Sequence, residues 1–101
     1  PRRVRKRLSF ARRATADLDE IWDYSEKEWG REQAIRYASE IVARCEGLVD
    51  GKIVPQMVTL RSGCFIRLRS GSHFVFVQAT PNELRVVRIL HERRDAEAGL
   101  G

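Results

Sequence analysis

The feature that most constrains the fold is the segment from Cys64 to Asp95, which contains three short runs rich in β-branched and aromatic residues. The runs are Cys64–Arg69, Ser72–Thr80 and Leu84–His91. Ser70-Gly71 separates the first two runs, Pro81-Asn82-Glu83 separates the second from the third, and both separators have the composition of turns. The segment therefore predicts two consecutive hairpins that form a three-stranded antiparallel meander.

The middle run of this meander has the pattern of a central strand. Residues Phe74–Val77 are apolar at every position, which is typical of a strand buried on both faces. The chain from the end of the last run, His91 to Asp95, is polar and includes the arginine pair Arg93-Arg94. We expect it to project from the last strand as a tail.

Two amphipathic helices are predicted before the meander. Thr15 or Asp17 is a plausible N-cap, and the acidic residues that follow suit the positive end of a helix dipole, so the first helix is expected from about Ala16 to Trp29. Gly30 favours the end of that helix, and helical periodicity restarts immediately after it. The second helix is expected to end near Asp50-Gly51, which makes the pair a tight hairpin.

The remaining segments complete an α+β fold. Residues 7–10 alternate polar and apolar side chains like a short N-terminal strand, the natural fourth strand of the sheet. Residues 51–63 are predicted to be a loop with one extended piece around Met57–Leu60. The expected order is an N-terminal strand, a helical hairpin and the three-stranded meander, in one domain covering residues 1–101, with residues 1–6 as a flexible basic arm.

The distribution of charge along the chain indicates the chemical class of its partners. Residues 1–16 carry a net charge of +7, residues 17–50 carry −6 and residues 51–101 carry +4. This polarity indicates a polyanionic or acidic partner for the chain ends, and a charge that serves only solubility is the alternative.

Cys45 and Cys64 are too few for a disulfide framework, so both are expected to be reduced and buried in a cytoplasmic protein. The sequence contains no membrane-spanning run, metal-ligand cluster or phosphate-cradling glycine loop, so we expect no membrane association, metal or cofactor.

Three landmarks occur in a fixed order along the chain. They are Asp17-Leu18 with Ile21-Trp22-Asp23-Tyr24, then Trp29-Gly30, then Val87-Arg88-Ile89-Leu90-His91 with Arg93 and Asp95. Over residues from about 8 to 100 the sequence resembles the ParE branch of the ParE/RelE family of bacterial toxin–antitoxin toxins. The resemblance implies a β-α-α-β-β-β fold and a cytoplasmic type II toxin that inhibits DNA gyrase by binding. It also implies a hetero-oligomer with a neutralising ParD-like antitoxin, whose C-terminal segment would be amphipathic and acidic.

The chain departs from the family pattern at two places. Many relatives carry a Tyr-Arg pair where Val77-Gln78 stand here, and a methionine where Arg94 stands. If the target surface uses these positions, the choice of target or the potency is expected to differ from that of the relatives.

Six side chains on the strands and the tail are candidates for contacting the target: Arg67, Arg69, Arg88, His91, Arg93 and Arg94. RelE-like relatives cut messenger RNA on the ribosome, which requires a general base, a general acid and cations at the phosphate. The arginines supply cations and His91 supplies an imidazole, but no second acid–base partner is evident. We therefore assign no catalytic residue and keep a RelE-like endoribonuclease as the alternative. His91 is expected to stabilise the C-terminal turn by hydrogen bonding, with Asp95 as a candidate partner, and His73 is expected to be an ordinary strand residue.

The antitoxin is expected to bind the helical hairpin, because the small sheet should leave part of its apolar stripe uncovered. The candidate contacts are Leu18, Ile21, Trp22, Trp29, Tyr37 and Ile41. They would form a groove for an amphipathic helix, while acidic antitoxin residues meet Arg67, Arg69 or the N-terminal arm. The alternative is that these residues are simply core.

A third functional hypothesis is a basic nucleic-acid-binding domain without toxicity. In that case Phe65, Phe74 and Phe76 would stack bases on the face of the sheet. Burial of the same phenylalanines in the core is the alternative.

Overall fold

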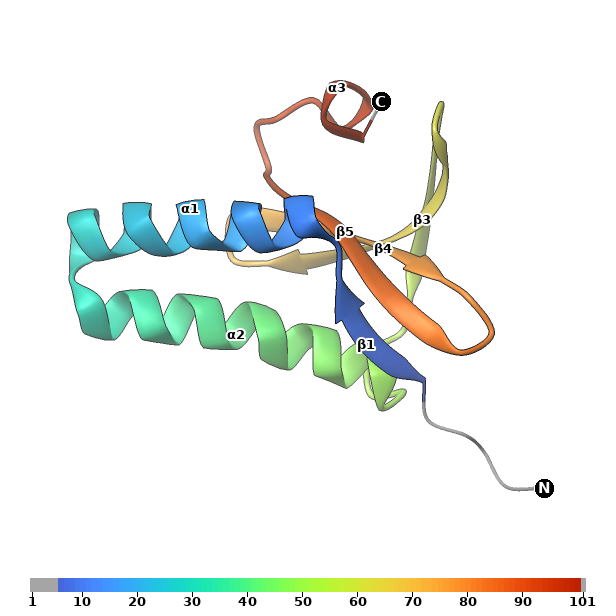
Figure 1. Cartoon of the computed structure of the whole chain (residues 1–101), viewed down its shortest axis with the longest axis horizontal. Helices are drawn as coiled ribbons and strands as arrows, with labels where there is room; N and C mark the ends of the chain where they lie inside the picture. The colour runs from blue at the N-terminus through green and yellow to red at the C-terminus, as the bar shows by residue number, and fades with distance from the viewer. Residues whose placement is uncertain (1–5, 101) are drawn as a thin grey trace.

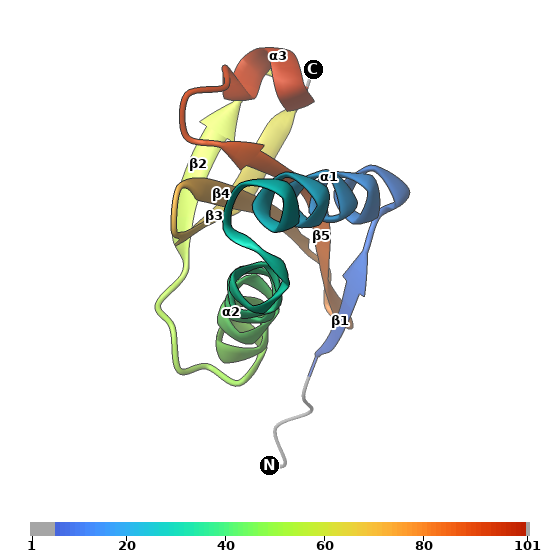
Figure 2. The same ribbon diagram turned by 90° about the vertical axis from the view of Figure 1, so that its left-hand side faces the viewer.

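The computed structural model describes residues 6–100, which form a mixed sheet and three helices in the α+β arrangement predicted from the sequence (Figures 1 and 2). The elements in chain order are β1 (Arg7–Phe10), α1 (Arg12–Trp29), α2 (Arg31–Val49), β2 (Gln56–Leu60), β3 (Gly63–Ser70), β4 (His73–Ala79), β5 (Glu83–His91) and α3 (Ala96–Leu100). Of the predicted flexible arm, residues 1–5 lie outside the described residues.

The sheet has the strand order β1-β5-β4-β3-β2. Strands β2 to β5 are antiparallel neighbours, whereas β1 pairs with β5 in parallel. The prediction of a central strand is confirmed, because β4 is in the middle of the sheet and Val75, Phe76 and Val77 are all buried. The extended piece expected near Met57–Leu60 is a full strand, β2, so the meander has four strands rather than three.

The two faces of the sheet are covered differently. The α1–α2 hairpin packs on one face, where the fully buried side chains include Ile41, Cys45 and Val86 (Figure 1). On the other face, α3 packs over a smaller cluster formed by Phe65, Phe76 and Leu90. The predicted projecting tail was therefore wrong, because the chain turns after β5 and folds back onto the sheet as α3.

The predicted start of the first helix was also wrong. Helix α1 begins at Arg12, and its N-cap residue, Ala11, has extended backbone and provides no side-chain cap. The Ala11 N–H donates to the Val86 carbonyl at 2.8 Å, so the pairing of β1 with β5 sets the point where the helix begins. Asp17 consequently lies inside the helix and is buried.

The predicted break between the helices is confirmed at Gly30. Its φ of 91° lies in the region that favours glycine, and its N–H donates to the Glu26 carbonyl at 2.9 Å. Helix α2 begins at the next residue, so the hairpin is tight, and its turn projects beyond the sheet (Figure 1).

Candidate functional site

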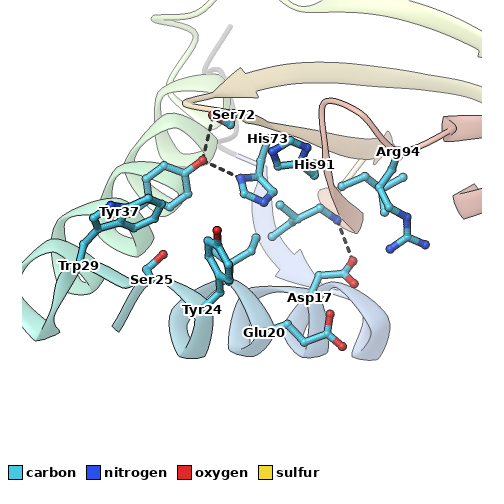
Figure 3. A pocket seen from close by; sticks show the side chains of 13 residues that line it. Asp17, Glu20, Tyr24, Ser25, Trp29, Tyr37, Ser72, His73, His91 and Arg94 are labelled. Carbon is cyan, nitrogen blue, oxygen red and sulfur yellow. Dashed lines mark hydrogen bonds between the residues drawn. The ribbon is translucent and has the colours of Figure 1, made fainter. Parts of the chain in front are cut away.

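A pocket of about 360 Å³ lies between the helical hairpin and the ends of β4 and β5 (Figure 3). Its walls carry three exposed or half-buried aromatic side chains, two imidazoles and three charged groups: Tyr24, Trp29, Tyr37, His73, His91, Asp17, Glu20 and Arg94. Its apolar floor includes Ile21 and Ile89. The aromatic end lies toward the hairpin turn, and Glu20 and Arg94 lie at the other end (Figure 3).

Tyr37 links α2 by hydrogen bonds to the turn between β3 and β4. Its hydroxyl accepts the Ser72 N–H at 2.9 Å and is hydrogen-bonded to His73 Nδ1 at 2.6 Å. The turn approaches the ring so closely that a Cβ at Gly71 would lie 2.6 Å from Tyr37 Cε1, and the φ of Gly71 is 59°. Tyr37 is thus a fixed wall of the pocket rather than an adaptable contact.

The two imidazoles face each other from neighbouring strands. His73 and His91 are register partners on β4 and β5, with ring centroids 5.3 Å apart. His91 Nδ1 accepts the Arg93 N–H at 3.2 Å, so the predicted hydrogen-bonding role of His91 in the turn is confirmed, although its partner is Arg93 and not Asp95. His73 is not an ordinary strand residue, because it bonds to Tyr37 and lines the pocket.

The environment of His73 predicts a loss of stability in mild acid. Burial, and secondarily the neighbouring His91, lower the pKa of His73 from its ordinary value of 6.5. The unfolded chain therefore takes up the proton before the folded protein does, and the free energy of unfolding should fall as the pH drops through about 6.5 and continue to fall until the lower, folded-state pKa is passed. Urea titrations of the native protein and His73→Asn at pH 7.5, 6.5 and 5.5 measure this effect. The variant should show a weaker pH dependence, and an equal dependence in both proteins would contradict the assignment.

Only some of the predicted antitoxin contacts lie together in the pocket. Ile21, Trp29 and Tyr37 line the pocket, while Leu18 and Trp22 are half-buried elsewhere on α1. Ile41 is 0% exposed within the core, so the prediction that it contacts a partner was wrong.

Tyr24 is a pocket residue that was missed. It is 60% exposed and makes an edge contact with Trp29, with ring centroids 5.6 Å apart. The available signal was its position three residues after Ile21, which places the two side chains on the same side of a helix.

The prediction that Arg88 contacts the target was wrong, because Arg88 is only 7% exposed. Its Nε and Nη2 donate to the two carboxylate oxygens of Asp17 at 2.8 and 3.0 Å, and Nη1 donates to the Gly99 carbonyl at 2.7 Å. Asp17 also accepts the Ile89 N–H at 2.9 Å. The hydrogen bonds to Asp17 raise the pKa of Arg88. Asp17 and Arg88 therefore join α1, β5 and α3.

The other target candidates divide between two surfaces. Arg67 and Arg69 lie on the sheet face opposite the hairpin, with their guanidinium carbons 4.7 and 5.2 Å from the centre of the Phe74 ring, and Arg69 pairs with Glu92 at 2.5 Å. His91 and Arg94 instead line the pocket. Arg93 is exposed beside them in the turn after β5.

The proposed base-stacking face is not available. Phe65 and Phe76 are 3% and 2% exposed beneath α3, so only Phe74 remains partly accessible. The hypothesis of a stacking nucleic-acid module was therefore wrong for two of its three aromatic residues.

The departures from the family pattern fall in different environments. Val77 is fully buried beneath the hairpin, Gln78 is exposed, and Arg94 lines the pocket. Only the change at Arg94 alters the pocket wall.

The two cysteines also differ. Burial raises the pKa of the Cys45 thiol to about 11, which keeps it protonated. Cys64 is exposed, contrary to the prediction.

Within residues 6–100, no group of three or more His, Cys, Asp or Glu side chains is arranged to hold a metal ion. None of the helices in this range combines the length and the apolar character that a bilayer span requires.

Comparison with known proteins gives consistent results. Residues 8–96 match the family described as the ParE toxin of the type II toxin–antitoxin system parDE. Toxin ParE1 of Caulobacter vibrioides is 42% identical over 97 residues, which cover 95% of this chain and 99% of that protein. Toxin ParE1 of Mycobacterium tuberculosis is 34% identical over 86% of this chain and 90% of its own length.

The fold also matches a solved structure, the chromosomal ParDE TA system from P. aeruginosa. The TM-score is 0.72 at 21% sequence identity, over 86% of this chain and 96% of that chain. At this identity the likeness concerns the fold alone.

Proposed function

Because the chain belongs to the ParE family of toxins of type II toxin–antitoxin systems, we propose that it binds and inhibits DNA gyrase in the cytoplasm and is neutralised by a ParD-like antitoxin. Both activities are proposed to reside in residues 1–101 as one domain. The mechanism is binding, without covalent chemistry on the target.

The observation that carries this proposal is the composition of the pocket. Trp29 and Tyr24 are 63% and 60% exposed at its aromatic end, which is unusual for large aromatic side chains in a small protein. Exposed aromatic residues beside a concave apolar floor fit the apolar face of an amphipathic helix. The pocket is therefore the proposed antitoxin site.

The same pocket gives a simple mechanism of neutralisation. His91 and Arg94, which are candidates for contacting the target, share the pocket with the proposed antitoxin contacts. An antitoxin segment seated between α1 and β5 would cover these two side chains. In this mechanism the antitoxin neutralises the toxin by occupying part of the surface that gyrase requires.

One observation favours the alternative, a ribosome-dependent endoribonuclease. The pocket brings His73 and Tyr37 close to His91, so a second proton-transfer group is present where the sequence showed none. However, His73 Nδ1 is bonded to Tyr37 and His91 Nδ1 is bonded to the Arg93 N–H. Because these bonds hold His73 to α2 and His91 to the turn after β5, we favour binding over RNA cleavage.

A gyrase assay tests the proposal directly. The purified protein should inhibit supercoiling, and Arg93→Ala with Arg94→Ala should weaken that inhibition at least about tenfold while leaving the melting temperature nearly unchanged, because exposed charges rarely contribute more than about 1 kcal/mol. Arg31→Ala with Arg36→Ala removes the same charge from exposed sites on α2 and should inhibit like the native protein. Full inhibition by the Arg93/Arg94 variant would exclude the turn after β5 from the target site.

A parallel assay on translating ribosomes separates the two mechanisms. Messenger RNA should remain intact in the presence of the protein. RNA cleavage that disappears in both His73→Asn and His91→Ala would replace gyrase inhibition with the endoribonuclease function.

A further inference from the structure

A second charged surface lies around the junction of β1 and α1, one helical turn before Asp17, the first residue of α1 that lines the pocket. It consists of Arg7, Arg12, Arg13 and Arg85, all exposed, and is called the junction patch below. The parallel pairing of β1 with β5 places Arg85 opposite Ser9, and the chain enters α1 directly beyond that point (Figure 1). Arg7 and Arg85 are 78 residues apart in the sequence but lie on the same face of neighbouring strands, and Arg12 and Arg13 begin the helix that follows β1.

The patch is not neutralised within the protein. In the part of the chain that the structure describes, none of its four guanidinium groups pairs with a carboxylate. Glu83 is the acidic residue opposite Arg7 in the sheet, and it accepts a hydrogen bond from the Ser9 hydroxyl at 3.2 Å. That hydrogen bond comes from a neutral hydroxyl and leaves the charge of Glu83 in place, so the four arginines and Glu83 together carry a net charge of +3 that is available to a partner.

Two of these arginines are placed against the local preference of the helix. Arg12 and Arg13 occupy the first turn of α1, which contains no acidic residue and has no side-chain cap. Cations are unfavourable at this end, because the helix dipole is positive there. Residues that destabilise the fold and have no structural role are expected at functional surfaces.

The composition of the patch indicates the class of partner. At protein interfaces, arginines are usually accompanied by buried aromatic and apolar anchors. The exposed large apolar side chains of residues 6–100 are Tyr24, Trp29, Ile35, Val54 and Met57, and none belongs to the patch. Contacts to a nucleic-acid backbone need only cations directed at phosphates, and they require no apolar anchor.

We propose that the junction patch binds the phosphate backbone of duplex DNA. The DNA held by gyrase is the natural substrate for this contact, and that assignment rests on the proposed function, whereas DNA binding itself does not. The toxin would then engage both components of the enzyme–DNA complex, using the pocket side for protein and the junction patch for DNA.

The test is a fluorescence anisotropy titration of a labelled 20-base-pair duplex with the toxin alone, between 50 and 200 mM KCl. If four phosphates are contacted, the logarithm of the binding constant should fall with the logarithm of the salt concentration with a slope of about −3 to −4, a loss of about 10²-fold over this range. The variant Arg12→Gln/Arg13→Gln/Arg85→Gln should bind at least about tenfold more weakly at 50 mM KCl and show a slope near about −1. It should melt at or above the temperature of the native protein, since the change removes cations from the first turn of α1.

A matched variant distinguishes loss of the junction patch from a general reduction of the protein's net charge as the cause of weaker DNA binding. Arg31→Gln/Arg36→Gln/Arg61→Gln removes three exposed arginines elsewhere and should keep the native affinity and slope. Equal losses in both variants, or no binding by the native protein, would overturn the proposal. Patch-dependent binding of a polyglutamate peptide that equals or exceeds DNA binding would also overturn it, in favour of an acidic protein partner.

A gyrase assay on the same proteins keeps this inference distinct from the proposed function. Patch-dependent DNA binding by a protein that does not inhibit gyrase supports the DNA contact and removes the gyrase proposal. Inhibition of gyrase by a native protein that does not bind DNA supports the gyrase proposal and removes the DNA contact.

Discussion

Asp17→Ala is expected to destabilise the folded protein by about 3–5 kcal/mol, because it leaves the guanidinium group of Arg88 buried without its counter-ion. The side chains of Asp17 and Arg88 are only 11% and 8% exposed. The substitution also removes the acceptor of the Ile89 N–H, so a backbone donor is left without a partner inside the sheet. For a chain of this size the melting temperature should fall by more than about 12 °C.

Two further variants identify the cause of that loss. Asp17→Ala/Arg88→Met replaces both charges by apolar groups and should recover part of the stability, because a missing pair costs less than an unpaired buried charge. Asp19→Ala changes an exposed carboxylate on the same helix and should shift stability by less than about 0.5 kcal/mol. A change below about 1 kcal/mol for Asp17→Ala, measured by urea denaturation, would show that the pair does not hold α1, β5 and α3 together.

Trp29→Ala is expected to weaken antitoxin binding by at least about 2 kcal/mol, or about 30-fold in Kd. Trp29 forms the aromatic end of the pocket with Tyr24, and exposed tryptophans in such positions are common binding hot spots. Because the side chain is 63% exposed, its removal should leave the melting temperature almost unchanged. Calorimetric titration with the co-encoded antitoxin measures the effect.

The matched control is Ile35→Ala. Ile35 is a large apolar side chain, 44% exposed on α2, and it does not line the pocket. Its removal should leave antitoxin affinity within about twofold of the native value. Native affinity in Trp29→Ala, or an equal loss in both variants, would place the antitoxin elsewhere.

The predictions that succeeded rest on local patterns. The break at Gly30 and the buried centre of β4 are visible within a few residues, because helix ends and doubly buried strands have short sequence signatures. Such patterns were sufficient for the fold class. They also identified Trp29 and Tyr37 as pocket candidates, since both lie on amphipathic helices.

The failures have a common physical origin in contacts between distant segments. Asp17 was interpreted as a helix cap because nothing near it reveals Arg88, which lies 71 residues away. For the same reason Arg88 looked like a surface cation, and the contact between Tyr37 and His73 was not foreseen. Side chains such as these can be assigned only when the positions of the strands are known.

The parallel pairing of β1 with β5 affects how this protein can be synthesised. Residues 7–10 bond to residues 83–86, so β1 leaves the ribosome well before the strand with which it pairs. Closing so long a segment makes the final sheet a late and slow event in folding. A chain terminated before β5 would lack Arg88, the partner of buried Asp17, and the strand that carries His91. The toxin is therefore expected to become active only when its synthesis is nearly complete.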